Sequence, residues 1–349
     1  MTAPLISVCI PAYNRASVLR ELLDSILTQD FDDFDVVICE DRSPERAAIR
    51  GVVEGLPPAW QPRVRYLEND ANLGYDANVR NVMARASGDY CMLMGNDDVM
   101  APGALRIVGA ALRRSAGVGV VLRTYASFDG TIDNINQTFR YFDSERVFEP
   151  GAESIIAFFR RSVVLPGMVI RREAALQYAT DEFDGSLLYQ LYIVGRIMAR
   201  ERGLYLPEVI TFYRNGGVPD FGNSASERGK FVPGVIVPDA SLHFMECMLR
   251  IARTIQERTG LPVYQPIVHD LANYSFTFIM LHADKPWRVF GRYCWRLARM
   301  GFGRYPLFYA YALSLVTLGP DRMWGVIRYI KRKMGRTPVL GRVHRGQAL

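Results

Sequence analysis

The stretch that decides the fold is residues 6–15, which read Ile-Ser-Val-Cys-Ile-Pro-Ala-Tyr-Asn-Arg, an apolar run that ends in polar residues. Apolar residues recur at helical spacing over residues 17–27, and a second apolar run occupies residues 34–39. The alternation continues to the apolar run at residues 90–94. Short apolar runs that alternate with amphipathic helices are typical of βαβ units in a parallel sheet. We therefore predict an α/β domain in the first part of the chain.

The pattern is less regular over residues 119–203. There we predict strands at residues 120–124 and 163–170, with helices around residues 152–160 and 186–202. We therefore predict that this part of the chain forms both strands and helices.

The chain as a whole predicts three regions. Residues 214–233 are rich in Gly, Asn, Ser and Pro, which indicates a flexible loop, and residues after 240 show apolar helical periodicity. We expect an α/β domain over residues 1–225, a helical region packed on it over residues 226–284, and a basic amphipathic tail over residues 285–349.

The composition excludes several classes of protein. The 349 residues are 49% hydrophobic, 22% charged and 11% aromatic, which argues against a disordered, collagen-like or coiled-coil chain. The five cysteines are odd in number and far apart, so we expect no disulfide framework and favour a reducing cytoplasm. No basic segment followed by a long apolar stretch opens the sequence, so we expect no secretory signal.

The positive charge is concentrated at the C-terminal end. Residues 285–349 carry a net charge of +13 and the rest of the chain carries −7. Arginines recur every three or four residues along 288–299, while Trp287, Phe290, Cys294 and Leu297 mark another face of the same predicted helix. Such a helix favours an anionic membrane surface over nucleic acid. The alternative is that the apolar face packs on the main domain.

The membrane contact is expected to be peripheral. The longest uncharged run spans residues 305–320 and contains Pro306 and Gly319. A membrane span needs about 20 apolar residues, so this run is short for one. We predict a cytoplasmic protein that lies on the inner face of the cell membrane.

Polar residues follow the predicted strands at the points where ligands bind in open α/β sheets. The first strand ends in residues 11–15, the second in residues 40–43, and the strand at 90–94 in residues 95–98. Asp41 could hold a nucleoside by hydrogen bonds, while Asp97 and Asp98 could hold Mg²⁺ or Mn²⁺, which prefer oxygen ligands. The alternative is that the two adjacent acids only cap a helix or close a turn.

Five segments resemble the motifs of one enzyme family in order and spacing. They are Ser7-Val8-Cys9-Ile10-Pro11-Ala12-Tyr13-Asn14-Arg15, Glu40-Asp41-Arg42-Ser43, Asn72-Leu73-Gly74, Ala86-Ser87-Gly88-Asp89-Tyr90 and Asn96-Asp97-Asp98. In this respect the chain resembles the family 2 glycosyltransferases, inverting enzymes with the GT-A fold. The Gly-Asn-Asp-Asp form of the last segment is similar to bacterial O-antigen sugar transferases of the abequosyltransferase type.

The resemblance implies a nucleotide-sugar site and a metal site. Its donor-binding residues would be Pro11, Ala12, Tyr13, Arg15, Glu40, Asp41, Asn72, Asn78, Asn96 and Asp97, and its metal ligands would be Asp97 and Asp98. Two of the motifs depart from the family pattern. Gly95 stands where the metal motif often has its first Asp, and Glu40 and Arg42 replace the first and third members of an Asp-Asp-Gly-Ser motif.

The general base is expected from the second half of the domain, before a helix, as in the family. We predict Asp184 for this role and Asp181 as the second choice. A carboxylate opposite the leaving group can remove the acceptor's proton in a direct displacement, which inverts the anomeric centre. The alternative is that Asp184 and Ser186 cap the following helix.

Together these features predict an inverting glycosyltransferase of surface polysaccharide (O-antigen-like) biosynthesis. It would move a sugar from a nucleotide-sugar donor to a saccharide linked to polyprenyl diphosphate. One alternative is a catalytically inactive, membrane-bound nucleotide-sugar-binding protein, because Gly95 stands in place of the first Asp of the metal motif. The other is a nucleotidyltransferase, although residues 11–15 lack the Gly-rich, cationic phosphate loop that such an enzyme needs.

Overall fold

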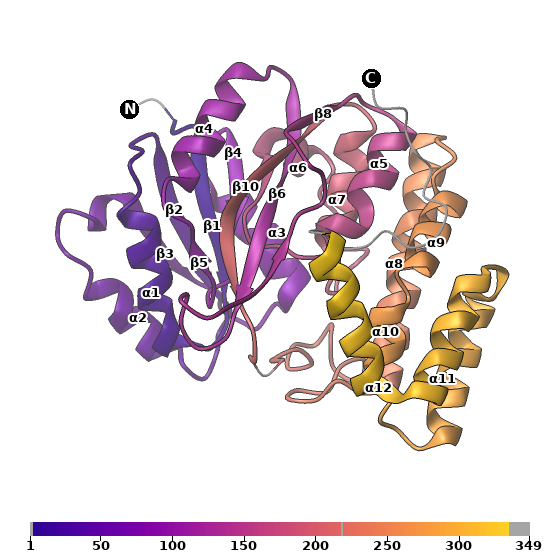
Figure 1. Cartoon of the computed structure of the whole chain (residues 1–349). Coiled ribbons are helices and arrows are strands. Elements are labelled where there is room, and N and C mark those ends of the chain that lie inside the picture. The colour runs from indigo at the N-terminus through magenta and orange to yellow at the C-terminus, as the bar shows by residue number, and fades with distance from the viewer. Residues whose placement is uncertain (1–2, 218, 335–349) are drawn as a thin grey trace.

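A mixed β-sheet forms the centre of the computed structural model, which describes residues 3–217 and 219–334 (Figure 1). Its strands lie in the order β3-β2-β1-β4-β9-β6-β10-β5, with β7 beside β6 and β8 beside β10. The bounds are β1 (Ile6–Ala12), β2 (Phe34–Glu40), β3 (Val64–Glu68), β4 (Tyr90–Leu93), β5 (Val99–Met100), β6 (Val118–Phe128), β7 (Ile135–Phe139), β8 (Arg146–Phe148), β9 (Met168–Arg171) and β10 (Arg202–Arg214). The predicted α/β fold is confirmed.

Helices cover both faces of this sheet (Figure 1). The bounds are α1 (Ala16–Leu27), α2 (Arg46–Glu54), α3 (Tyr75–Arg85), α4 (Ala104–Arg114), α5 (Ala152–Phe159), α6 (Arg172–Gln177), α7 (Tyr189–Met198), α8 (Pro238–Thr259), α9 (Tyr264–Asn273), α10 (Phe276–Met280), α11 (Trp287–Arg299) and α12 (Pro306–Met334), with short 3₁₀ turns η1 (Gln61–Arg63), η2 (Arg160–Ser162) and η3 (Phe302–Arg304). Side chains alternate across β1 because strand residues point to opposite faces. Val8 and Ile10 join a core cluster with α1 and α4, whereas Cys9 joins a second cluster with α3 and α7.

The strands β3, β2, β1 and β4 run parallel, so their carboxyl ends meet at one edge of the sheet. The chain reverses at β9, which pairs antiparallel with both β4 and β6. The long strand β10 then returns parallel to β6. Loops from both the parallel and the mixed part of the sheet therefore surround the same edge.

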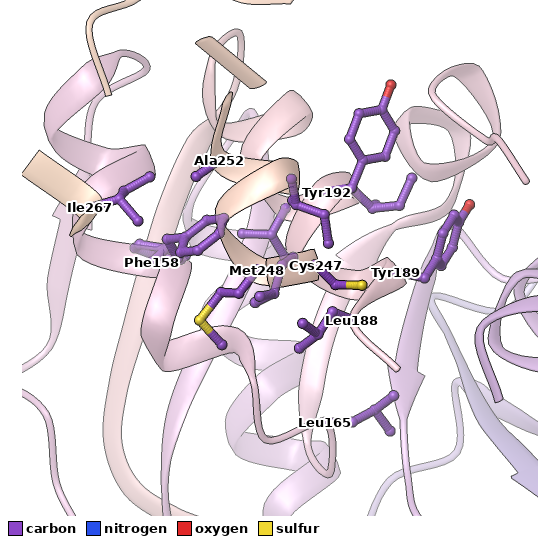
Figure 2. Packing of buried hydrophobic residues seen from close by; sticks show 14 of the residues in the cluster. Phe158, Leu165, Leu188, Tyr189, Tyr192, Cys247, Met248, Ala252 and Ile267 are labelled. Atoms are coloured by element: carbon purple, nitrogen blue, oxygen red, sulfur yellow. The ribbon is translucent and has the colours of Figure 1, made fainter. Parts of the chain in front are cut away.

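The C-terminal helices share one apolar core with the sheet. Figure 2 shows Phe158 of α5, Tyr192 of α7, and Met248 and Ala252 of α8, which belong to one cluster of buried residues. The same cluster continues through Leu297 of α11 and further residues of α12. It crosses the predicted region boundaries at residues 225 and 284, which stay predictions.

The amphipathic tail is divided between a packed face and an exposed face. Phe290, Leu297, Phe302 and Phe308 are buried, as the packing alternative predicts. Other large side chains of the same helices are exposed, among them Trp287, Trp295, Tyr309, Leu313 and Val316. Residues 335–349 of the predicted tail lie outside the described residues.

The fold resolves two further sequence questions. The cysteines are all unpaired, in agreement with the expected lack of a disulfide framework. Within residues 3–217 and 219–334, we find no helix that has both the length and the apolar character needed to span a membrane.

Candidate nucleotide-sugar site

A pocket of about 470 Å³ opens at the carboxyl ends of β1, β2 and β4. It gathers most of the residues that the family resemblance assigns to the donor. These are Pro11, Tyr13, Arg15, Asp41, Asn72, Asn78, Asn96 and Asp97. They come from segments up to 86 residues apart in the sequence, and the parallel register of the strands brings them to the same place.

Two residues assigned to the donor do not line the pocket. Ala12 is fully buried in the core cluster beside α1. Glu40 is also fully buried, and its carboxylate accepts the backbone N–H groups of Arg42 (3.0 Å) and Ser43 (2.6 Å) and the guanidinium of Arg46 (2.8 Å). Glu40 therefore closes the turn after β2, where Arg42 has a left-handed φ of 52°.

Asp41 is a buried carboxylate in the lining of the pocket. Its Oδ1 accepts hydrogen bonds from Asn69 Nδ2 and the N–H of Leu73, both at 2.8 Å, and its Oδ2 accepts the N–H of Gly74 at 2.9 Å. Burial raises the pKa of Asp41, and these three hydrogen bonds oppose the rise. The bonds fix the carboxylate while leaving Oδ2 room to accept a further hydrogen bond from a ligand.

The segment after β3 is held against a loop from the other side of the pocket. Gly74 has a φ of +87°, and a Cβ atom there would lie 2.4 Å from Ser224 Oγ, so only glycine fits. Glu227 joins the two segments because its carboxylate accepts the N–H groups of Tyr75 (2.7 Å) and Gly222 (2.9 Å). The loop over residues 219–227 is thereby fixed across one wall of the pocket.

The end of β4 carries the acidic pair. Asp97 faces the pocket and forms an ion pair with Arg15. Asp98 points into the protein, where it accepts the N–H of Arg214 at 3.0 Å, and burial raises its pKa to about 7. A Cβ atom at Gly95 would lie 2.5 Å from Asp98 Oδ2. The departure from the family pattern at Gly95 therefore makes room for the buried carboxylate.

The donor set limits how a metal ion could be held. In the part of the chain that the structure describes, no group of three or more His, Cys, Asp or Glu side chains is placed to bind a metal. Asp97 is the predicted ligand that lines the pocket, and Asp98 does not line it. Mg²⁺ commonly binds through one or two carboxylates and completes its shell with water and substrate phosphates. The residues therefore fit a cation that is shared with a bound diphosphate.

The predicted base residues lie elsewhere. Asp184 forms a bidentate pair with Arg80, with distances of 2.6 and 2.8 Å, and Asp181 is exposed on the same turn. Neither residue lines the pocket. The alternative was that Asp184 and Ser186 cap the following helix, α7. Ser186 Oγ accepts the N–H of Leu188 at 3.1 Å, just before α7, but Asp184 takes no part and most of the N–H groups there bind Asp76 of α3. Its carboxylate accepts the N–H groups of residues 186, 187 and 189, each at 2.8 Å.

The rest of the pocket comes from segments that carry no recognised motif. Residues 163–166, Leu187, residues 213–217 and residues 219–221 line it. The composition of residues 214–233 predicted a loop there, but nothing in the sequence placed that loop over the strand ends. Its position follows from β10, which delivers the loop to the same edge as β1 and β4.

The fold is similar to those of solved structures. S. aureus TarS 1-349 in complex with UDP-GlcNAc matches with a TM-score of 0.60 and 15% identity, over 98% of both chains. A mannosyltransferase from Pyrobaculum calidifontis, in complex with GDP-Man and Mn²⁺, matches with a TM-score of 0.51 and 16% identity, over 95% of this chain and 81% of that one. The chain therefore has the GT-A class of fold.

Sequence comparison gives the family within that class. The model described as "Glycosyl transferase family 2" matches residues 7–178, so the chain carries a family 2 glycosyltransferase domain. Abequosyltransferase RfbV of Salmonella typhimurium is 34% identical over 114 residues, which are 33% of this chain and 34% of that protein. A GalNAc(5)-diNAcBac-PP-undecaprenol beta-1,3-glucosyltransferase of Campylobacter jejuni is 31% identical over 103 residues, 29% of this chain and 32% of its own length. The matches thus span about a third of these curated relatives.

Proposed function

We propose that the chain is an inverting glycosyltransferase that takes a sugar from a nucleotide-sugar donor. The observation that carries this proposal is the pocket at the strand ends, where the motif residues of a family 2 domain surround one fixed, buried carboxylate, Asp41. A nucleoside offers N–H and hydroxyl donors. Asp41 Oδ2 can accept a hydrogen bond from one of them. The solved relative TarS holds UDP-GlcNAc in a fold of the same class.

The proposed reaction is a direct displacement at the anomeric carbon. A lone pair of the acceptor hydroxyl forms the new bond to that carbon, and the bond from the carbon to the diphosphate oxygen breaks with its electron pair. The hydroxyl proton passes to a carboxylate of the pocket. Negative charge develops on the leaving nucleoside diphosphate. Of the two arginines that line the pocket, Arg15 and Arg214, we assign its stabilisation to Arg15, which lies beside Asp97.

A divalent cation would be held by Asp97 together with the diphosphate. When bound, it supplies Lewis-acid stabilisation of the leaving group. Arg15, which pairs with both Asp97 and Asp220, would then exchange Asp97 for the phosphate oxygens. We propose Mg²⁺ or Mn²⁺ because both prefer oxygen ligands.

We place the general base on Asp220. The acids that line the pocket are Asp41, Asp97, Asp220 and Glu227. Asp41 and Glu227 are both engaged with backbone N–H groups, and Asp97 is paired with Arg15. Asp220 has a third of its side chain exposed, lies on the loop that faces the strand ends, and forms a longer ion pair with the same Arg15, at 3.7 Å. Asp184 and Asp181 remain second choices, because neither lines the pocket and Asp184 pairs more closely with Arg80 than Asp220 does with Arg15.

The proposed acceptor is a saccharide linked to polyprenyl diphosphate, in the synthesis of a surface polysaccharide. The Campylobacter relative is a glucosyltransferase named for such an acceptor. An acceptor with a lipid anchor requires the enzyme to work at a membrane. The exposed apolar side chains of α11 and α12, together with the basic residues of the tail, support contact with the inner face of the cell membrane.

The proposal is tested by hydrolysis and transfer assays on the purified full chain with a panel of nucleotide sugars, with and without Mn²⁺. Release of nucleoside diphosphate that depends on one donor supports the transferase. A donor that binds but is never cleaved, even with lipid-linked acceptors, would identify the inactive binding protein. Release of pyrophosphate from a nucleoside triphosphate would point to the nucleotidyltransferase.

A further inference from the structure

A groove of about 580 Å³ lies between α8, α9, α11 and η3, apart from the nucleotide-sugar pocket. Three exposed arginines line it, namely Arg253, Arg299 and Arg304. Its lining in the described chain includes no Asp or Glu. Over the same described residues, we find no ion pair between these arginines and a carboxylate. The groove therefore concentrates uncompensated positive charge.

Aromatic side chains hold two of these guanidinium groups without neutralising them. Arg253 donates a hydrogen bond to the hydroxyl of Tyr264 at 3.1 Å, and its guanidinium lies 4.9 Å from the centre of that ring. Arg299 lies 5.0 Å from the centre of the Trp295 ring. Cation–π contacts of this kind orient the cation and leave its charge available. A guanidinium binds phosphate through two parallel hydrogen bonds, so phosphate is the anion that the groove suits.

An apolar stripe begins at the rim of this groove. Tyr309 of α12 lines the groove and is 54% exposed, and Leu313 and Val316 follow one and two turns later with exposures of 65% and 69%. No charged residue occurs over residues 306–318. A soluble phosphate would gain nothing from this stripe, whereas the acyl chains beside a lipid headgroup would cover it.

We propose that the groove binds the phosphate of an anionic phospholipid while the stripe on α12 contacts the lipid chains. The site rests on the membrane contact of the proposed function, and it makes that contact specific to one place. Binding in the groove differs from a general attraction between the basic tail and an anionic surface. Every arginine of α11 would contribute to that attraction, but only some of them reach the groove. Arg288 and Arg292 of the same helix do not line it.

Those two arginines provide a matched control. Full-length protein is sedimented with vesicles of phosphatidylcholine alone or mixed with phosphatidylglycerol. We compare the unchanged chain with Arg299→Gln/Arg304→Gln and with Arg288→Gln/Arg292→Gln, which remove the same charge. We call the first double variant the groove pair and the second the outer pair. The groove pair should lower the partition coefficient on anionic vesicles at least about tenfold more than the outer pair, because charged hydrogen bonds to the phosphate add to the surface attraction. An equal loss of vesicle binding in both double variants would rule out the groove as the lipid site, but it would still agree with contact between the tail and the membrane.

A second measurement tests whether the groove pair binds less because it is misfolded, and whether the ligand is a soluble phosphate. In a chain with Trp60, Trp287 and Trp324 replaced by Phe, Trp295 reports on the groove. Brominated phosphatidylglycerol should quench its fluorescence, and the groove pair should abolish the quenching. Inorganic phosphate that changes this fluorescence without vesicles, and competes fully with them, would contradict the lipid assignment. Donor binding, measured in parallel, should be unchanged, so that failure of the groove and failure of the transferase are separate results.

Discussion

The two walls of the nucleotide-sugar pocket are built by different means. The wall from β1, β2 and β4 is fixed by the sheet, and its acidic side chains are tied to backbone N–H groups or to arginine, as Asp41 and Asp97 are. The opposite wall consists of loops, in which Asp220 is one-third exposed and lies 3.7 Å from Arg15, while Glu227 accepts the N–H of Tyr75 of α3. Rigid residues suit the nucleotide, which is common to many donors. Loop residues suit the acceptor and the chemistry of transfer.

The largest expected effect is at the loop wall. Asp220→Asn should keep donor binding and lower turnover roughly 100-fold to 10,000-fold, because the amide cannot accept the hydroxyl proton. Steady-state kinetics and donor titration would measure this. Asp184→Asn is the comparison, and it should change the melting temperature more than turnover, since Asp184 pairs with Arg80. The reverse pattern would return the base to Asp184.

The next effect is at the strand wall. Asp97→Ala should lower the rate at least about 100-fold, because stabilisation of the leaving group by a metal is worth several kcal/mol. The stability of the fold should change little, since Asp97 lies on the pocket surface. Rates measured over a Mn²⁺ titration would check it. A variant with near-normal activity would rule out Asp97 as the metal ligand.

A third prediction concerns Asp76, which joins the two walls by binding the start of α7 beside Leu187. Burial raises its pKa from 3.8 to about 6, so the folded chain holds more protons than the unfolded chain between these values. Its contribution to the free energy of unfolding is therefore greatest at pH 4 and below, and falls as the pH rises through 6.

Denaturant unfolding of the unchanged chain and of Asp76→Asn would measure this difference. The advantage of the unchanged chain should shrink by up to about 3 kcal/mol between pH 4 and pH 7, at about 1.4 kcal/mol per pKa unit. The lost N–H contacts add an offset that does not depend on pH. A difference that grows with pH would show that the folded-state pKa is lowered instead.

The smallest effect is expected at Gly95, which lies beside Asp98 in the strand wall. Asp98 in turn accepts the N–H of Arg214 from the opposite wall. Gly95→Ala should lower the free energy of unfolding by about 1–3 kcal/mol, because the new methyl group displaces a buried carboxylate. Gly51→Ala is the control. A Cβ atom there meets nothing within 4 Å, and α2 should gain about 0.5–1 kcal/mol. Thermal unfolding of both variants would compare them, and equal stability would show that the site at Gly95 can relax.

The same contrast between walls explains what could be predicted from the sequence. The strand wall follows from local patterns, since β1, β2 and β4 begin where the apolar runs begin, and motif residues lie at or just after the end of each strand. The loop wall depends on β10, which the sequence did not reveal because Pro207 and Glu208 interrupt its pattern. The structure accommodates them at register shifts between Leu206 and Val209, where a strand tolerates proline.

Two other differences have local causes. The strand predicted at residues 163–170 begins only at Met168, because Gly167 has a φ of +79° and the preceding residues turn into the pocket. The predicted base was chosen from an acidic turn, and the sequence could not show that Arg80, 104 residues away, would pair with Asp184. Contacts between distant segments decide both the loop wall and the base.

The central claim is that the pocket around Asp41 binds a nucleotide sugar. The most direct test is the melting temperature of the full chain with a panel of nucleotide sugars and Mn²⁺, because a ligand that binds only the folded state raises it. We predict that at least one donor stabilises the unchanged chain and Glu40→Gln, whose carboxylate faces away from the pocket, but not Asp41→Ala. The account would be contradicted if no donor raised the melting temperature, or if the same donor stabilised Asp41→Ala equally.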